Sequence, residues 1–407
     1  MSASTTTAPK PAPTPKTGTS NPLVAISQNL RESGIYIAFV VVVLLFAVLT
    51  DGLSLSPGNI TNIILQYSYV LVLAIGMLIV IVAGHIDLSV GSVVAVTGAI
   101  SAQLVIGSGH PWWVGVLAAI GVGLVIGAWQ GFWVAFIGIP AFIVTLAGML
   151  LFRGLTYYVL DNVSLSPFPA AYTQVATGFL NGLFGGNGYD AFTLFIAAFA
   201  VAGFAFSQVR TRVAKVRYQQ VVDAMPLFIL KIVVVAVVVM AFAWQLAHSR
   251  GLTIVLIILG ALILVYSVVM KSSVFGRQVY AIGGNLSAAL LSGVNVRWVN
   301  FWIFVNMGFL AAVAGIIFSS RSNGAQPSAG TSFELDAIAA AFIGGAAVTG
   351  GVGKIQGAMI GGLLVGVISN GMQLLGVDQS LQSVIKGLVL LLAVAFDVFN
   401  KRRAGVR

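Results

Sequence analysis

The stretch FGRQVYAIGGNLSAALLSGV, residues 275–294, is a polar interval marked by glycines, and it lies between two long apolar runs. Three basic residues, Lys271, Arg277 and Arg297, are spread along it and its flanks. In a chain this hydrophobic, such an interval belongs in water, so we expect it to lie outside the membrane.

The middle of this interval, residues 285–291, predicts a short helix. Asn285 or Ser287 can serve as its N-cap, two alanines favour its propagation, and Gly293 stops it. A short helix between two membrane spans can act as a handle, because a partner that grips it can move both spans together. An ordinary loop helix at the membrane surface is an equally open alternative.

Composition places the whole chain in a membrane. Of the 407 residues, 59% are hydrophobic and 7% are charged, whereas soluble domains carry roughly 25% charged residues. The 47 glycines, and the absence of β-type alternation, indicate tightly packed transmembrane helices rather than barrel strands. We therefore expect an all-α, polytopic helical bundle.

The charges and the rare residue types argue against several functions. The net charge of +10 could suggest nucleic acid, but the basic residues sit in short gaps between apolar runs, as the positive-inside rule requires. The chain has no cysteine, 3 histidines and 10 carboxylates. A metal, hydrolytic or thiol site has little material, and we expect no catalysis, no cofactor and no nucleic-acid partner.

The chain divides into a tail and one transmembrane domain. Residues 1–22 are rich in Ser, Thr, Pro, Ala and Lys, which predicts a disordered cytoplasmic tail rather than a secretory signal. In the domain, residues 23–407, about twelve runs approach the ~20 residues that cross the hydrocarbon. The expected spans are 34–50, 60–83, 88–107, 112–137, 141–160, 190–208, 226–247, 252–270, 298–320, 335–350, 355–376 and 381–399.

The basic residues orient these spans. With the N-terminus inside, few of the 20 Lys and Arg residues fall in spans or outside, namely Arg153, Arg250, Arg321 and Lys386. Both termini and the loop 271–297 are therefore expected to be cytoplasmic. At its depth, Arg153 must snorkel outward or meet a partner such as Asp161.

Two segments differ from the rest of the domain. Residues 161–189 contain no basic residue and form the longest expected external loop, which can dock a partner or simply connect two spans. Residues 190–247 share no motif with the other spans, so we treat them as an inserted hairpin in a ten-span core. The basic loop of this hairpin, Arg210 to Arg217, fixes orientation and touches anionic lipid.

Polar residues interrupt the apolar chain at two places, residues 84–92 and 334–339. Each interruption puts an aspartate, Asp87 or Asp336, at the first turn of an expected helix, where capping accounts for it. Alternatively, broken helices in two repeats line a substrate path. The expected topology puts Asp87 near the inner face and Asp336 near the outer face, as two inverted repeats would require.

Uncharged hydrogen-bonding groups also occur within the expected spans. They can join helices, or they can line a passage for a polyhydroxylated, neutral solute, which needs donors and acceptors but no counter-charge. The candidate residues for such a path are the uncharged Ser89, Gln130, Thr145, Asn306 and Asn370, together with Asp87 and Asp336 from the two interruptions.

Several motifs occur in the order of one known family. They are IDLSVGS (86–92), PAFIVTLAG (140–148), YAIGGN (280–285), LSGVN (291–295), ELDAIAA (334–340) and GGVG (350–353). From about residue 55 to 400 the chain resembles the permease subunits of monosaccharide ABC importers of the ribose/xylose class. The inserted hairpin, with FRGL (152–155) leading to SPFP (166–169), looks most like the xylose and multiple-monosaccharide branch.

The resemblance implies a bacterial inner-membrane permease that pairs as a homodimer. It implies two partners, a sugar-type ATPase inside, which binds ATP and Mg, and an extracytoplasmic sugar-binding protein. It also implies a segment that couples to the ATPase, namely Gly283, Gly284, Asn285, Ser287, Ala288, Ala289, Leu290, Ser292 and Gly293. Relatives commonly carry a glutamate and a basic residue where this chain has Ser287 and Leu290, so apolar docking must contribute more here.

Two other functions remain as alternatives. An ion-coupled secondary transporter needs ionisable groups in the membrane, and Asp87 and Asp336 are the pair available. A membrane enzyme acting on a lipid-linked substrate would need clustered acids or histidines, for which His85 beside Asp87 is the only hint. The sequence does not identify which sugar an importer would carry.

Overall fold

The computed structural model describes residues 22–220, 222 and 224–403. The predicted tail, residues 1–22, lies outside this range apart from Pro22. The helices are α1 Pro22–Leu49, α2 Pro57–Val82, α3 Val90–Ala102, α4 Trp112–Phe132, α5 Ala141–Val159, α6 Ala170–Thr177, α7 Ala191–Arg217, α8 Met225–Ala247, α9 Ile254–Ser272, α10 Val274–Gly284, α11 Leu286–Leu291, α12 Val296–Ser322, α13 Phe333–Ile343, α14 Ile355–Leu374 and α15 Gln379–Arg403. The all-α prediction is confirmed, since the described strands, β1 Phe179–Leu180 and β2 Leu252–Thr253, form one two-residue antiparallel pair.

Nine helices of the described residues are long and apolar enough to cross a membrane. They are α2, α3, α4, α5, α7, α8, α9, α12 and α14, with π-helical turns at 103–107 and 133–137 extending α3 and α4. The apolar parts of α1 and α15, Gly34–Leu49 and Gln379–Leu392, are shorter. The predicted span 335–350 is wrong, because α13 has 11 residues and glycines with positive φ, among them Gly345 and Gly350, follow it.

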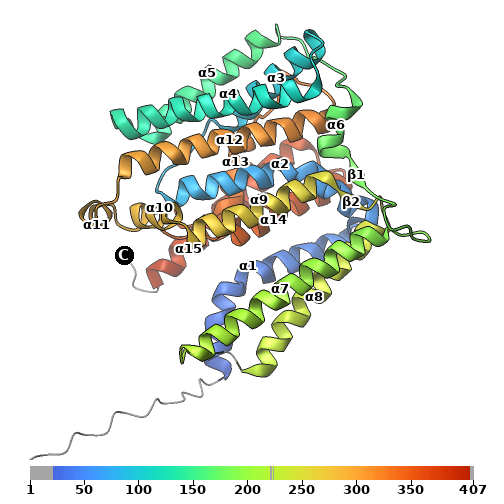
Figure 1. The fold of residues 1–407 in the computed structure, drawn as a ribbon, viewed down its shortest axis with the longest axis vertical. Coiled ribbons are helices and arrows are strands. Elements are labelled where there is room, and N and C mark those ends of the chain that lie inside the picture. Colours follow the sequence, from blue (N-terminus) through green and yellow to red (C-terminus); the bar gives the residue numbers. More distant parts are fainter. Residues whose placement is uncertain (1–21, 221, 223, 404–407) are drawn as a thin grey trace, which may run out of the picture.

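The core is built around α2 and α12 (Figure 1). From Val70 onward α2 is apolar on every side, and a helix of that kind must be surrounded by protein or lipid. Here protein surrounds it, since Val70 to Val82 are all buried. The helix α12 packs on α4, α2 and α3, and α14 packs on α13 and α2.

Glycines allow α4 and α12 to approach each other closely. A Cβ on Gly123 would lie 2.5 Å from the Gly308 carbonyl oxygen, and one on Gly127 would lie 2.4 Å from the Phe304 carbonyl oxygen. Such contacts replace the hydrophobic effect as the source of helix association in lipid. Gly123, Gly127 and Gly308 therefore serve helix packing.

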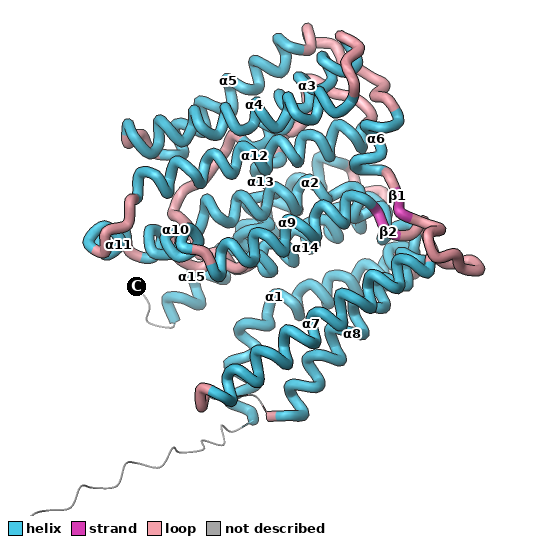
Figure 2. Tube along the Cα trace, viewed as in Figure 1, coloured by secondary structure: helices cyan, strands magenta, loops and turns pink. Residues whose placement is uncertain are grey.

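The helices α1, α7 and α8 form a layer beside the main bundle (Figure 2). The helices α7 and α8 pack mainly on each other, and α8 meets α2 through its last turns, where Ala243, Leu246 and Ala247 are buried. The bundle has two ends, which we name the α11 end and the α6 end after the helices that lie there (Figure 1). The turn between α7 and α8 lies at the α11 end.

Two helices, α3 and α13, begin inside the bundle rather than at an end. The Phe333 ring, at the start of α13, lies 4.3 Å from the ring of Tyr69, which is near the midpoint of the 26-residue α2. The start of α3 lies beside the loop before α13, because a Cβ on Gly91 would lie 2.1 Å from the Gly330 carbonyl oxygen. Segments 83–89 and 323–332 are thus non-helical backbone within the bundle.

Candidate functional site

The helix α10 is anchored to the bundle at the α11 end. A Cβ on Gly283 would lie 1.7 Å from the Val82 carbonyl oxygen, so glycine is required where α10 crosses the end of α2. The same carbonyl oxygen accepts a hydrogen bond from the Gly351 N–H at 2.8 Å. The Tyr280 hydroxyl donates to the Gly353 carbonyl oxygen at 2.7 Å, and burial raises the pKa of the Tyr280 phenol, which therefore keeps its proton. The sequence pattern does not indicate this helix or its contacts.

The short helix α11 follows directly, and its predicted cap is confirmed. The Asn285 carboxamide oxygen accepts a hydrogen bond from the Ala288 N–H at 2.9 Å, and Gly293 has a φ of +79° just beyond the helix end. Of the residues expected to couple to a partner, Ala289 is buried and Gly283 is half-buried. The exposed members are Gly284, Asn285, Ser287, Ala288, Leu290, Ser292 and Gly293.

The exposed face of α11 is apolar. Leu286 and Leu290 are about half exposed, and Leu291 is 90% exposed. An isolated exposed leucine is ordinary, but three on a six-residue helix make a contiguous apolar surface at one end of the bundle. We name Leu286, Leu290 and Leu291 the α11 leucine surface.

Four of the predicted path residues are brought together in the bundle. The Asp87 Oδ1 accepts hydrogen bonds from the Ser89 N–H at 2.8 Å and from the Ser89 hydroxyl at 2.7 Å. The Gln130 amide donates to the Ser89 Oγ at 2.6 Å, and the Thr145 hydroxyl donates to the Ile86 carbonyl oxygen at 3.3 Å. Asp87, Ser89, Gln130 and Thr145 are all buried, and they connect segment 83–89 to α4 and α5.

The predicted position of Asp87 in a first helical turn is wrong. The helix α3 begins at Val90, and Ser89 is its N-cap residue without a side-chain hydrogen bond to the helix. Asp87 instead satisfies the backbone and hydroxyl of Ser89 within the non-helical segment. A two-residue reach of this kind competes with helix formation and explains the later start of α3.

The other three predicted path residues lie elsewhere. Asp336 is in the first turn of α13, as expected, and its carboxylate pairs with the Lys386 ammonium of α15 at 3.3 Å. Asn370 and Asn59 exchange two amide hydrogen bonds, of 2.9 and 3.0 Å, between α14 and α2. Asn306 accepts a hydrogen bond from the Tyr266 hydroxyl.

The expected placement of the two aspartates at opposite faces is also wrong. Asp87 lies just before the start of α3, and Asp336 lies in the first turn of α13. Both helices begin inside the bundle, where Gly91 and Gly330 meet. The topology expected from the sequence misses this because it places both aspartates at span ends.

Arg153 meets a partner, which is one of its two expected environments, but that partner is the loop before α13 rather than Asp161. Its guanidinium donates to the carbonyl oxygens of Pro327 and Ala329, in the loop before α13. Glu334, the first residue of the second polar interruption, lies next to this loop, and a Cβ on Gly91 would lie 2.5 Å from its Oε2. The ELDAIAA motif contains Glu334, but its position next to the loop that Arg153 binds depends on the fold.

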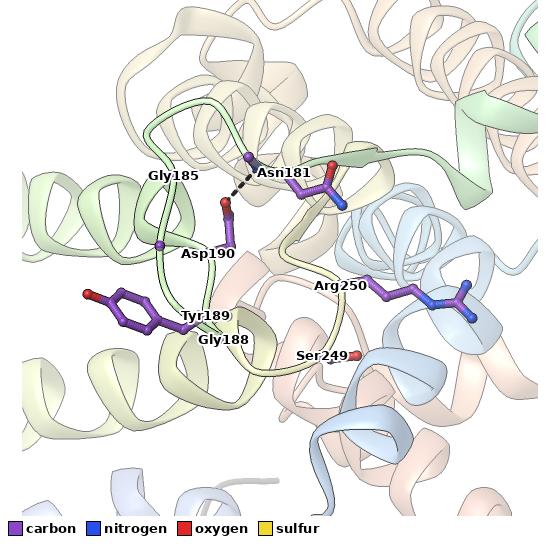
Figure 3. Close-up of a pocket in the computed structure, with 10 residues that line it drawn as sticks. Asn181, Gly185, Gly188, Tyr189, Asp190, Ser249 and Arg250 are labelled. Atoms are coloured by element: carbon purple, nitrogen blue, oxygen red, sulfur yellow. Dashed lines mark hydrogen bonds between the residues drawn. The ribbon is translucent and has the colours of Figure 1, made fainter.

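A hollow of about 410 Å³ at the α6 end is lined by residues of loops 181–190 and 247–250 (Figure 3). Asp190 accepts hydrogen bonds there from the Gly182 N–H at 3.0 Å and the Thr193 N–H at 2.9 Å. Its carboxylate therefore closes the loop and caps α7. No group of three His, Cys, Asp or Glu side chains that could hold a metal occurs in the described part of the chain.

Comparison with known proteins identifies the family. Residues 59–394 match the model of the branched-chain amino acid transport system permease component. The chain belongs to this family. It is a multi-pass membrane protein and the permease component of a bacterial ABC importer, and hence a transport subunit rather than an enzyme.

Relatives of this permease match nearly its whole length. It is 39% identical over 377 residues to the xylose transport system permease protein of Haemophilus influenzae, covering 93% of this chain and 98% of the relative. It is 36% identical over 378 residues to the xylose transport system permease protein of Escherichia coli K12, covering 93% and 94%. The ribose import permease protein of Bacillus subtilis is 34% identical over 371 residues, with coverage of 90% and 93%.

No solved structure matches the permease. Membership of the family excludes the two alternatives left open by the sequence, the ion-coupled secondary transporter and the membrane enzyme.

Proposed function

We propose that this permease forms the membrane path for a monosaccharide, such as xylose or ribose, in an ATP-driven importer. The similarity to xylose and ribose permeases over at least nine-tenths of the chain supports the substrate class. Arabinose, galactose and glucose belong to the same chemical class and are alternative cargoes. Selection among them rests with the partner that delivers the sugar.

A companion ATPase, which binds ATP and Mg, docks on the α11 leucine surface. The observation that carries this proposal is the exposure of Leu290 and Leu291 on a helix that is joined to a rigidly anchored α10. Because Gly283 contacts Val82 and Gly351, a displacement of α11 is transmitted to α2 and to loop 344–354. Apolar contacts replace the charge pairs that Ser287 and Leu290 cannot make.

The α11 end is cytoplasmic, with both termini on that side. Lys271, Arg277 and Arg297 support this orientation, since they lie around α10 and α11. The proposed topology has twelve membrane segments if α1, α15 and the half-length α13 are counted, arranged as two inverted repeats with residues 190–247 as an inserted hairpin. The α6 end, including residues 161–189, then faces an extracytoplasmic sugar-binding protein.

Two copies of the permease pair as a homodimer in the inner membrane, and the path alternates between outward-open and inward-open states. We assign Asp87, Ser89, Gln130 and Thr145 to the wall of this path, because they hold non-helical segment 83–89 in place. Asn306, Asp336 and Asn370 have partners on neighbouring helices, which supports helix joining as their role.

The docking proposal is tested by placing a charge on the leucine surface. In Leu290→Asp/Leu291→Asp the permease should still insert and purify, but the ATPase should no longer co-purify, and sugar-stimulated ATP hydrolysis should disappear. Tyr218→Asp is the matched control, because it places the same charge on an exposed residue of the α7–α8 turn, outside α11, and the ATPase should still co-purify with it. Retention of the ATPase by the double variant would refute docking at α11.

A further inference from the structure

The loop between α12 and α13 turns back into the bundle. Ala325 is still near the α6 end, where it pairs through its backbone with Leu165. Pro327 and Ala329 lie beside Arg153, which is six residues before the end of α5 and thus about 9 Å inside it at 1.5 Å per residue. Phe333 then reaches the midpoint of α2 at Tyr69. Residues 326–334 therefore lie at the depth of the spanning helices.

This re-entrant loop is polar and open. Gln326, Ser328, Thr331 and Ser332 are exposed, and Glu334 is half-buried. Irregular backbone at membrane depth is tolerated only where it is covered by protein or lines a water-filled cavity. Because these side chains are hydroxyls, a carboxamide and a carboxylate, a water-filled cavity suits them better than a dry protein interface.

Two charged groups flank the loop. Arg153 is fixed by the carbonyl oxygens of Pro327 and Ala329, and no ion pair engages Glu334 among the described residues. A charge placed within a helical bundle in lipid marks a substrate pathway more often than a structural contact. In addition, the Ser92 hydroxyl, in the first turn of α3, is buried and has no hydrogen-bond partner in the described structure.

We propose that the transported sugar is held in transit by the re-entrant loop, with Glu334 and Arg153 as its charged contacts. A monosaccharide presents several hydroxyls, each of which can donate and accept a hydrogen bond. The Glu334 carboxylate and the Thr331 and Ser332 hydroxyls accept from them, and the Arg153 guanidinium donates. This assignment rests on the proposed sugar transport and adds the place where the sugar is bound.

Accessibility provides the first test, because the chain has no cysteine and each introduced thiol is unique. The complete transporter, reconstituted with its ATPase and sugar-binding protein, is treated with a water-soluble, membrane-impermeant thiol reagent. Thr331→Cys should be labelled, and saturating xylose or ribose should slow its labelling. Ser108→Cys, in the exposed turn between α3 and α4 and outside loop 161–189, should be labelled regardless of sugar, and Leu150→Cys, on the apolar face of α5, should remain unlabelled.

Transport by Glu334→Gln is the second test. This variant keeps the shape of the side chain and removes the charge that accepts from sugar hydroxyls, so uptake should fall about tenfold. The ATPase should still co-purify with the variant. Asp378→Asn is the matched control, since Asp378 is exposed in the turn before α15, and its uptake should equal that of the unmodified protein.

The two failures are distinguishable. If the unmodified transporter takes up neither xylose nor ribose, the proposed function is overturned, and this assignment with it. The unmodified transporter could instead show normal uptake while Thr331→Cys is as inaccessible as Leu150→Cys, or while Glu334→Gln is fully active. Either result would overturn the re-entrant-loop site alone.

Discussion

Gly91 and Gly330 touch backbone to backbone at the point where α3 and α13 begin. A Cβ on Gly330 would lie 1.9 Å from the Gly91 carbonyl oxygen, and a Cβ on Gly91 would lie 2.1 Å from the Gly330 carbonyl oxygen. Neither glycine can therefore carry a side chain without separating the two helix starts. This contact joins the two non-helical segments of the bundle.

Substitution of Gly330 should be costly. Gly330 has a φ of +73°, so Gly330→Ala adds backbone strain to the steric conflict with Gly91, and we expect a loss of about 2 kcal/mol or more in stability. The midpoint of thermal unfolding of the purified permease measures this loss. Gly121→Ala, where a Cβ meets nothing within 4 Å, is the control and should change little. Equal midpoints for the two variants would contradict the close contact.

The hydrogen bonds among Asp87, Ser89 and Gln130 should contribute to the stability of the permease through the Ser89 hydroxyl. Ser89→Ala removes a hydroxyl that accepts from Gln130 and donates to Asp87, leaving both without that partner, and we expect a loss of about 1–3 kcal/mol. The exposed Ser108→Ala should be neutral in the same thermal unfolding assay. A neutral Ser89→Ala would show that the hydrogen bonds do not hold segment 83–89.

The ion pair between Asp336 and Lys386 should behave as a coupled unit. Lys386→Met leaves the Asp336 carboxylate, which is only 16% exposed, without its counter-charge, and this should destabilise the permease by about 2 kcal/mol. Asp336→Asn/Lys386→Met should recover part of that loss, because no unpaired charge remains. Thermal unfolding of the two single variants and the double variant measures the coupling. Strictly additive effects would argue against the pair.

The hydrogen bond that anchors α10 should affect the coupling of ATP hydrolysis to sugar more than it affects binding of the ATPase. Tyr280→Phe removes the hydroxyl that donates to the Gly353 carbonyl oxygen, at a cost of about 1 kcal/mol. The ATPase should still bind, but the ratio of sugar-stimulated to basal ATP hydrolysis should fall. Tyr218→Phe, an exposed tyrosine on the α7–α8 turn, should leave this ratio unchanged. An unaltered ratio in Tyr280→Phe would show that the anchor does not transmit motion.

The sequence predicts local features of this permease better than its long-range contacts. The Asn285 cap and the stop at Gly293 are each predicted from residues close by in the sequence, and both are confirmed. The contact of Gly283 with Val82 joins positions far apart in the sequence, and no local pattern contains it. The same holds for Arg153, whose carbonyl partners in the re-entrant loop replace the expected Asp161.

The polar residues of the bundle show the same difference between local features, which the sequence predicts, and long-range contacts, which it does not. Their residue type singles out Asp87, Gln130 and Thr145 as unusual within apolar runs, but only the fold shows that they share one group. The short α13 could be anticipated from the glycine pairs that follow it. Its start beside Tyr69, halfway along α2, could not, because it depends on how far the loop from α12 folds back.

Uptake of labelled xylose or ribose into proteoliposomes tests the central claim most directly. The vesicles contain the permease and its companion ATPase, with ATP inside and sugar-loaded binding protein outside. We predict uptake that requires ATP, continues in the presence of an uncoupler, and is lost in Leu290→Asp/Leu291→Asp. Uptake that proceeds without ATP and stops on addition of the uncoupler would contradict an ATP-driven permease operated through α11.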